Sequence, residues 1–229
     1  MNIILTCEHG GNKIPKEYKY LFDDDTSILQ THKAYDPGAL KLAKAISQKT
    51  DYFFFSEISR LLIELNRSIN SPNLFSHYSK NLNQNQKERI LNKYYFPFRN
   101  KVENLIRELV KKRENSFHIS VHTFTPVLNN QIRNTDIGIL YDPKRKNEKD
   151  FAVSFKNELL SKDKNLRIRF NYPYLGISDG FTSYLRKKLP QRNYIGIELE
   201  VNQKYVINNK TKREKLIQNL AATLDSILK

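Results

Sequence analysis

The sequence predicts an α/β sandwich, in which helices cover a central sheet. Two observations carry this prediction. Short apolar runs alternate with helical patterns along the chain, and a hydrophobic content of 39%, with 13 Phe and 13 Tyr, supports a substantial buried core. A chain of 229 residues with no internal repeat, low-complexity tract or linker suits one domain, so we expect a single domain over residues 1–229.

The N-terminal part of the chain is expected to begin with a strand and a helix. Ile3–Thr6 is a short apolar run and predicts the first strand. Asp36 and Pro37 then predict the start of a helix over Gly38–Gln48. Asp is a favoured N-cap residue, and Pro is favoured at the first helical position.

Two apolar runs and a long helical pattern fill the middle of the chain. Tyr52–Ile58 and Leu61–Leu65 predict two strands or one bent strand. Gln86–Glu114 predicts a helix that is interrupted near Pro97, because proline removes a helical hydrogen bond. The second half of this helix carries one apolar stripe, formed by Val102, Leu105, Ile106, Leu109 and Val110.

The second half of the chain again alternates strands and helices. Strands are expected over Phe117–Phe124, Asp136–Tyr141, Leu166–Tyr172 and Tyr194–Val201. A helix with inward Phe151, Phe155 and Leu159 lies between the second and third of these strands, and a short helix over Thr182–Lys188 precedes the fourth. The last helix is expected to start with a capping box of Thr211 and Glu214. Its buried stripe would consist of Leu216, Leu220, Leu224 and Ile227.

The formal net charge of +15 allows a reading of a different class, a basic nucleic-acid-binding protein without catalysis. The 39 Lys and Arg residues are dispersed, however, and the densest cluster is Lys144–Lys146 in an expected turn. Lys, Asn and Ile are favoured throughout the chain, as AT-rich codon usage would produce, so we expect no specific nucleic-acid partner. A positive field of this size would still attract small anionic substrates.

The chain is expected to be cytoplasmic. No apolar stretch approaches the ~18 residues of a membrane span, and no basic segment followed by an apolar one suggests a signal peptide. Cys7 is the one cysteine, so no intramolecular disulfide can form, which fits a reducing compartment. We expect Cys7 to be a small buried residue of the first strand.

Two histidines sit at the ends of expected strands. His9 follows the first apolar run, and His122 lies near the end of the run that starts at Phe117. In open α/β sheets, ligands bind beyond the carboxyl ends of the strands. Neutral imidazoles and a carboxylate around an open position are what a hydrolytic zinc site requires. A half-exposed strand would explain His118, and His32 and His77 are expected at the surface.

Two glutamates share one face of the last expected strand. Glu198 and Glu200 are two residues apart and therefore point the same way. Two buried carboxylates so close would repel each other unless a cation lies near. One of them would be a natural general base for a metal-bound water. The alternative is that this face of the strand is exposed to solvent.

The remaining candidate site residues, taken one at a time, each have a simple structural explanation. The spacing of Asp36 favours the helix cap over a metal ligand, although its two oxygens allow both roles. Arg60, Asn66 and Arg67 flank an apolar run, and an arginine fork suits a substrate carboxylate. Surface arginine is the simpler reading of both arginines.

Taken together, these segments resemble the N-formylglutamate amidohydrolase family. The matching pieces occur in the expected order and span nearly the whole chain: CEHGGNKIP at 7–15, HKAYDPGALKLA at 32–43, SRLLIELNRS at 59–68, HISVHTF at 118–124, DIGIL at 136–140 and GIELEVNQ at 196–203. The family is similar to zinc carboxypeptidases. The resemblance therefore implies a three-layer sandwich with a mixed, mostly parallel central sheet of the phosphorylase/hydrolase-like type.

The resemblance also assigns roles to residues. It implies zinc near His9 and His122, with Asp36 as the third ligand, as in the similar zinc muramoyl-amidases. Asn12 stands where the carboxypeptidase pattern has a glutamate, which leaves Asn12 and Glu8 as alternatives for the third ligand.

Substrate and proton-transfer roles follow from the same resemblance. Asn66 and Arg67 resemble the carboxypeptidase pair that holds a substrate carboxylate, with Arg60 beside them. Glu200 is the closest match to the catalytic glutamate, and Glu198 is the alternative.

The expected function is thus that of a zinc-dependent amidohydrolase. It would cleave the amide of a small, anionic N-acyl amino acid such as N-formylglutamate, by zinc-activated water with a glutamate general base. Alternatives within the same class are a peptidoglycan amidase and a carboxypeptidase-like peptidase. Neither a nucleic acid nor a membrane is an expected partner.

Overall fold

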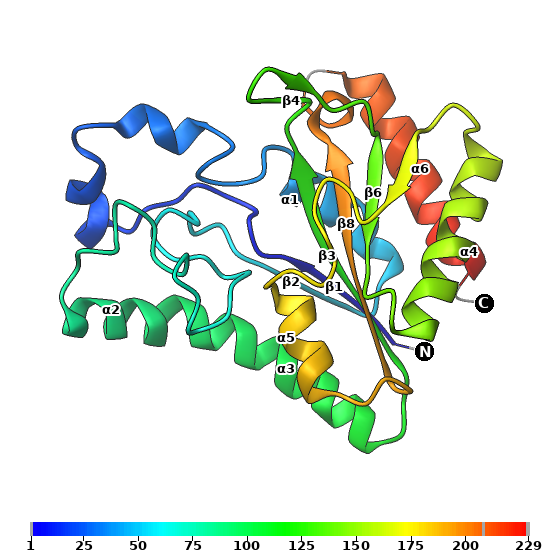
Figure 1. Cartoon of the computed structure of the whole chain (residues 1–229), viewed down its shortest axis with the longest axis horizontal. Helices are drawn as coiled ribbons and strands as arrows, with labels where there is room; N and C mark the ends of the chain where they lie inside the picture. The colour runs from blue at the N-terminus through cyan, green and yellow to red at the C-terminus, as the bar shows by residue number, and fades with distance from the viewer. Residues whose placement is uncertain (1, 208, 228–229) are drawn as a thin grey trace.

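A six-stranded sheet forms the centre of the molecule (Figure 1). The computed structural model describes residues 2–207 and 209–227. The strands occur in the order β2, β1, β3, β8, β6, β7. Their bounds are β1 Asn2–Cys7, β2 Tyr52–Phe55, β3 Ser116–Phe124, β6 Ile137–Leu140, β7 Ile168–Phe170 and β8 Tyr194–Asn202. All neighbouring strands run parallel except β6 and β8, which are antiparallel. The mixed, mostly parallel sheet confirms the predicted fold class.

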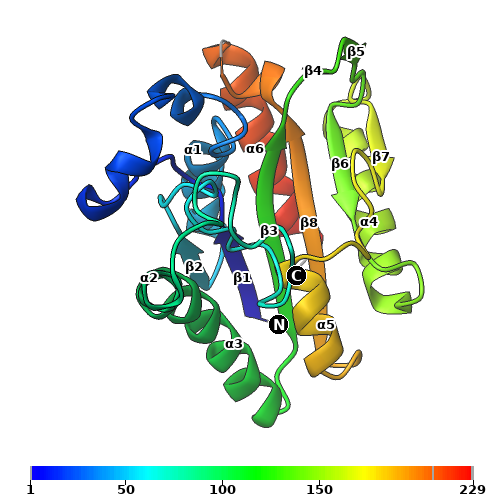
Figure 2. The ribbon, with the colours of Figure 1, turned by 60° about the vertical axis from the view of Figure 1, so that its left-hand side comes forward.

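Helices cover both faces of this sheet (Figures 1 and 2). On one face pack α1 Ala39–Ile46, α4 Lys146–Lys162 and α6 Lys210–Ile227, whose apolar stripes join the largest core cluster. On the other face lie α3 Phe96–Lys111 and α5 Phe181–Lys188. Helix α2 Gln84–Ile90 reaches α3 through a π-helical segment at Leu91–Tyr95, so the predicted interruption before Pro97 is confirmed. The result is three layers.

The central strands are buried on both faces. All nine residues of β3 are buried, including His118, which is fully inaccessible and not half-exposed as one sequence reading allowed. On the face toward α1, α4 and α6, the strands carry apolar residues, among them Cys7, Ile119 and Leu199. Cys7 is therefore the buried core residue that the sequence predicts.

The run Leu61–Leu65 is a buried turn and not a strand, which corrects one prediction. Leu62 and Ile63 both donate backbone hydrogen bonds to the carbonyl of Ser59, and Glu64 donates to the carbonyl of Leu74. Leu62, Ile63 and Leu65 pack in a satellite cluster with residues of the segment before α3, and Leu61 packs in a second one with Phe22 and Ala34. The apolar pattern alone was misleading because it indicates that these residues are buried and not whether they pair in a sheet.

Two predicted helix caps are also wrong. Helix α1 begins after Gly38, which has a φ of 86°, and no side chain caps it. Asp36 is not the cap, because its carboxylate is paired with Arg60 and His122 instead. At α6, the carbonyl oxygen of the Asn209 side chain accepts a hydrogen bond from the Lys212 amide at 2.9 Å, while Thr211 already lies inside the helix.

The sequence pattern missed several short elements. They are the β4–β5 hairpin, formed by Val127–Leu128 and Gln131–Ile132, and the 3₁₀ segments Lys16–Phe22, Thr26–Gln30, Ser47–Lys49 and Gln203–Tyr205. Within the described ranges, no helix combines the length and apolar character needed to cross a bilayer.

Candidate metal centre and active site

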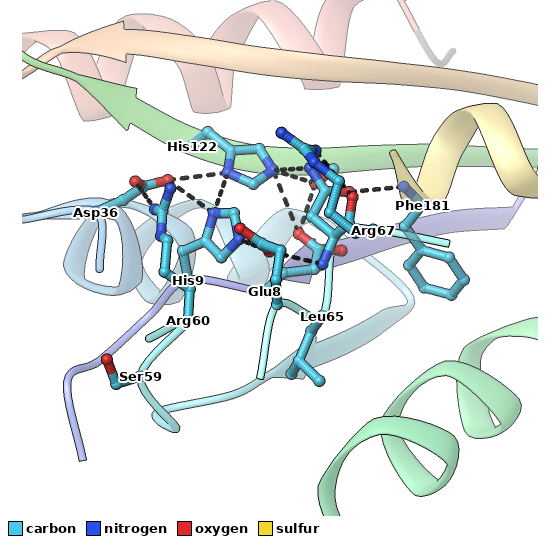
Figure 3. Close-up of polar contacts among 12 residues, drawn as sticks. Glu8, His9, Asp36, Ser59, Arg60, Leu65, Arg67, His122 and Phe181 are labelled. Carbon is cyan, nitrogen blue, oxygen red and sulfur yellow. Dashed lines mark hydrogen bonds and ion pairs between the residues drawn. The ribbon is translucent and has the colours of Figure 1, made fainter. Parts of the chain in front are cut away.

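The candidate site lies at the carboxyl ends of β1, β3 and β8 (Figure 3). His9 follows β1, and His122 on β3 pairs in register with Glu200 on β8. Gly10 lets the chain turn away directly after His9, because a Cβ atom there would come 2.7 Å from the Ser56 carbonyl oxygen. The sheet topology thus brings together residues that are more than one hundred positions apart in sequence.

Three donor atoms converge at this edge. The Nδ1 atoms of His9 and His122 are 3.2 Å apart, and Oδ2 of Asp36 lies 3.4 Å from the first and 2.9 Å from the second. All three residues are buried. Donor atoms about 3.3 Å apart are what ligands at about 2.0–2.1 Å from a tetrahedral zinc ion require.

The outer nitrogens of both histidines are already engaged. Nε2 of His9 contacts the Glu64 carboxylate, and Nε2 of His122 lies 2.8 Å from the Ser120 hydroxyl oxygen. Each imidazole therefore turns Nδ1 toward the other and toward Asp36. Two imidazole nitrogens and a carboxylate this close together are stable only when a positive charge lies between them. Either a proton or a metal ion can supply that charge. The donor set fits a divalent metal.

The ionisation of the site reflects this crowding. Burial lowers the pKa of His122, but the hydrogen bond and the charge of Asp36 outweigh it and raise that pKa to about 10. Burial opposes ionisation of Asp36 as well, yet Arg60 and His9 hold its pKa well below the usual range. The site thus favours one bound cation or proton next to an ionised aspartate.

Glu198 and Glu200 differ in their surroundings. The Oε1 atom of Glu198 accepts a hydrogen bond from the Thr182 hydroxyl at 2.7 Å. Oε2 of Glu200 is buried and has no hydrogen-bond partner among the described residues. Burial, together with the charges of Asp36 and Glu198, raises the pKa of Glu200 to about 8. Of the two, Glu200 has the buried oxygen without a partner in the described ranges.

Arg60, Asn66 and Arg67 all line the same cavity, but each has a partner within the protein. Arg60 is paired with Asp36. Asn66 accepts a hydrogen bond from the Phe181 amide at 2.6 Å and so holds the start of α5. Arg67 donates to the carbonyl oxygens of Asn66 and Asp179, at 3.1 and 2.7 Å.

The remaining sequence candidates lie outside the donor triad. The Asn12 side-chain amide donates to the Leu29 carbonyl oxygen at 2.8 Å. Glu8 lies 3.4 Å from Nε2 of His122, on the side of the ring away from Asp36. His118 contacts Thr6 and Tyr194 inside the protein, and His32 and His77 are exposed as predicted.

The cavity has a volume of about 230 Å³ and is lined mostly by polar residues. Its apolar lining comes from Tyr174 and Leu175, in the loop between β7 and α5. The end of this loop is fixed by Asp179, whose Oδ1 atom accepts a hydrogen bond from the Ser68 hydroxyl at 2.5 Å. Sequence reasoning did not identify these residues, because a loop carries no periodic signal.

Two further residues of the site were missed although the sequence carries a signal for one of them. Glu64 is a single charge inside the apolar run Leu61–Leu65, and a charge in such a place is rarely buried without a partner. Ser120 lies between His118 and His122 on the polar face of β3 and has no sequence signal of its own.

Comparisons with known proteins support the family resemblance. The sequence model of the N-formylglutamate amidohydrolase family matches residues 1–207. None of the curated proteins matches the chain in sequence.

Two solved structures share the fold. One is a gene product of Agrobacterium tumefaciens, with a TM-score of 0.78 and 24% identity over 100% of this chain and 92% of the other. The second is an N-formylglutamate amidohydrolase from Ralstonia eutropha, with a TM-score of 0.71 and 12% identity over 100% and 94% of the two chains. At these identities the likeness concerns the fold.

Proposed function

The chain belongs to the N-formylglutamate amidohydrolase family, a family of hydrolases acting on amide bonds, and from this membership we propose a metal-dependent enzyme that cleaves a small N-acyl amino acid such as N-formylglutamate. The observation that carries the proposal is the convergence of the His9, Asp36 and His122 donor atoms within 3.4 Å of one another. Glu200, a buried carboxylate with a free oxygen, lies next to them.

The three converging residues would hold the metal ion, with zinc as the proposed identity. Two imidazoles and one carboxylate leave a position open in a tetrahedral site, as catalytic zinc sites do. When bound, the ion would polarise the amide carbonyl of the substrate and make a nearby water more acidic. Arg60, paired with Asp36, holds this carboxylate in its orientation.

Glu200 would transfer the proton. Its Oε2 atom takes a proton from the attacking water and delivers it to the nitrogen of the leaving amine, so that the carboxylate is restored at the end of the reaction. A pKa raised to about 8 suits delivery of the proton to the amine, and the charge of a bound metal ion would lower this pKa and favour the carboxylate that starts the reaction. Glu198, bonded to Thr182, would orient the surrounding groups.

Cavity size and charge favour a single amino acid as the substrate. A cavity of about 230 Å³ is smaller than the roughly 300–1,000 Å³ of pockets for drug-sized ligands. Arg67 lines it and would bind the substrate carboxylate, with Arg60 adding positive charge. These features favour a small N-acyl amino acid over a peptidoglycan strand.

The test combines metal content with a substrate panel. Protein purified without added metal is analysed for zinc, and its activity is measured with N-formylglutamate, other N-acyl amino acids, a muropeptide and the carboxamides of the accepted acids. We expect about one zinc per chain and hydrolysis of the free acids only. The metal proposal is wrong if the purified protein contains less than a tenth of an equivalent of metal and added zinc does not activate it. A preference for the muropeptide or the carboxamides would refute the proposed substrate.

A further inference from the structure

Two buried glutamates stand behind the histidines of the candidate metal centre, on the side away from the cavity. We propose that Glu64 and Glu8 are positioning residues for the metal: Glu64 fixes the imidazole of His9 directly, and Glu8 fixes that of His122 through the Ser120 hydroxyl. The proposal rests on the metal site described above and goes beyond it, because it assigns a task to residues that neither bind the ion nor touch the substrate.

The contact between Glu64 and His9 is direct. Oε1 of Glu64 meets Nε2 of His9 and also accepts a hydrogen bond from the Asn66 amide at 2.9 Å. The Glu64 residue is 8% exposed. Among the described residues, no Lys or Arg nitrogen lies within 4.0 Å of its carboxylate, and the paired group is His9. The charge of Glu64 is therefore directed at this imidazole.

Glu8 contacts His122 indirectly, through the Ser120 hydroxyl. Its Oε2 atom accepts a hydrogen bond from the Ser120 hydroxyl at 2.6 Å, and the Ser120 oxygen is 2.8 Å from Nε2 of His122. Nε2 itself is 3.4 Å from Oε2 of Glu8. The order is thus carboxylate, hydroxyl, imidazole, with Nε2–H donating to the hydroxyl oxygen and the hydroxyl donating to Glu8.

The burial of Glu8 is costly unless a positive charge is near. The residue is fully buried, and its second oxygen has no hydrogen-bond partner in the described part of the chain. Within that part, His122 is the one basic side chain within 4.0 Å of its carboxylate. Isolated buried carboxylates are strongly disfavoured and persist where they are paired or serve a metal. A cation on the far side of His122 would compensate this charge.

Both contacts have the same effect on the imidazole. A proton on Nε2 that is donated outward leaves the lone pair on Nδ1, and in both histidines Nδ1 is the atom that faces Asp36. Acceptors behind a metal-ligating histidine fix its tautomer and ring orientation, and losing one costs typically 10–100-fold in metal affinity. Two such acceptors would pre-form the donor triad before the ion arrives.

The decisive measurement is zinc affinity by competition with a chromogenic chelator. We compare wild type with Glu64→Gln and Glu8→Gln, which keep an acceptor and remove the charge, and with Ser120→Ala, which breaks the connection from Glu8 without removing a charge. Glu17→Gln, on the exposed surface, is the matched control. We expect 10–100-fold weaker binding for the three site variants and no change for the control.

A second readout is independent of metal binding. Nitrogen NMR of the histidine side chains distinguishes the two tautomers, and we expect His9 to carry the proton on Nε2 in the metal-free wild type. In metal-free Glu64→Gln, where a neutral amide oxygen replaces the charged acceptor, His9 should populate both tautomers, whereas Glu17→Gln should match the wild type. If Glu8→Gln fails to fold by circular dichroism, Ser120→Ala tests the Glu8 contact. If Glu64→Gln fails to fold, Glu64→Asp, which keeps the charge but withdraws it from the imidazole, tests the Glu64 contact.

The outcomes separate this inference from the proposed function. Wild-type affinity retained in all three site variants overturns the positioning role while the metal site stands. Absence of zinc binding by the wild type overturns the metal site and this inference together.

Discussion

The two faces of the central sheet are equally buried, yet they are stabilised by different interactions. Toward α1, α4 and α6, the strands present Ile119, Val121, Leu199 and their apolar neighbours to helix stripes. On the other face, the same strands carry polar groups in their carboxyl-terminal halves, and residues of the loops after β1, β2 and β7 line the cavity beside them. Apolar burial needs only volume and shape, whereas every buried polar group needs a specific partner.

This difference explains where chemistry is possible in the molecule. The apolar face can exchange side chains of similar size at small cost, because its contacts are not directional. The polar face holds two histidines and several carboxylates whose positions depend on one another. Substitutions at the cavity on the polar face should therefore affect activity, and substitutions on the apolar face should affect stability.

The largest expected effect is on the polar face. Glu200→Gln keeps the shape of the side chain and removes its ability to take a proton, so kcat should fall by roughly 10²–10⁴ while zinc stays bound. Glu198→Gln is the matched control on the same face of β8, and it should reduce kcat much less, because its oxygen is bonded to Thr182. Steady-state kinetics and metal analysis check both.

The reverse result would assign proton transfer to Glu198, two residues before Glu200 on β8. If Glu198→Gln is inactive and Glu200→Gln retains activity, then Glu198 is the general base. If both variants remain active, proton transfer by this strand is wrong.

An intermediate effect is expected on the apolar face of β3. Ile119 is almost fully buried, so Ile119→Ala should lower the free energy of unfolding by about 2–5 kcal/mol and leave kcat of the folded enzyme unchanged. Ile132→Ala removes the same atoms from a side chain that is 73% exposed and should have little effect on stability. Urea unfolding and kinetics on the same samples separate the two quantities. A loss of kcat in folded Ile119→Ala would show that the faces are not independent.

A smaller effect concerns a polar residue of β3 that faces α5. Burial lowers the pKa of His118 to about 4 from an unfolded value near 6.5. Between these pH values the unfolded chain takes up a proton and the folded protein does not. Stability therefore falls as the pH drops from 6.5 to 4, by about 3 kcal/mol from this group.

Comparing variants isolates the contribution of His118. His118→Gln should flatten the dependence of unfolding free energy on pH over this range, while His77→Gln, at an exposed site, should keep the wild-type curve. Unfolding by urea at several pH values, with a chelator present, gives the measurement. Parallel curves for His118→Gln and wild type would mean that the buried imidazole is protonated in the folded state.

The apolar face was largely predictable from sequence, and the polar face only in part. Periodic patterns identified the main strands and helices, since burial against a helix leaves a regular signal. His9, His122 and the glutamates of β8 could be found because parallel strands present their carboxyl ends at one edge. Resemblance to a family then raised Asp36 above a helix cap.

The remainder of the site depends on loops, whose conformation no periodicity encodes. Leu61–Leu65 has the composition of a strand, but its backbone forms a turn that brings Glu64 behind His9. Tyr174 and Leu175 reach the cavity from the loop between β7 and α5, and nothing in their local sequence indicates this. Such positions are determined by tertiary contacts and by backbone hydrogen bonds between distant segments.

The pairing of β3 with β8 has a consequence for how this site can vary. His122 and Glu200 are direct partners in the ladder, so their separation is set by the spacing of adjacent strands, about 4.8 Å. A one-residue insertion in either strand would turn its histidine or glutamate away from the cavity and bring an apolar neighbour in. Lengthening or shortening the loops can therefore reshape the entrance for a different substrate. The distance between the proposed metal ligand and the proposed proton acceptor changes only if the sheet itself is rebuilt.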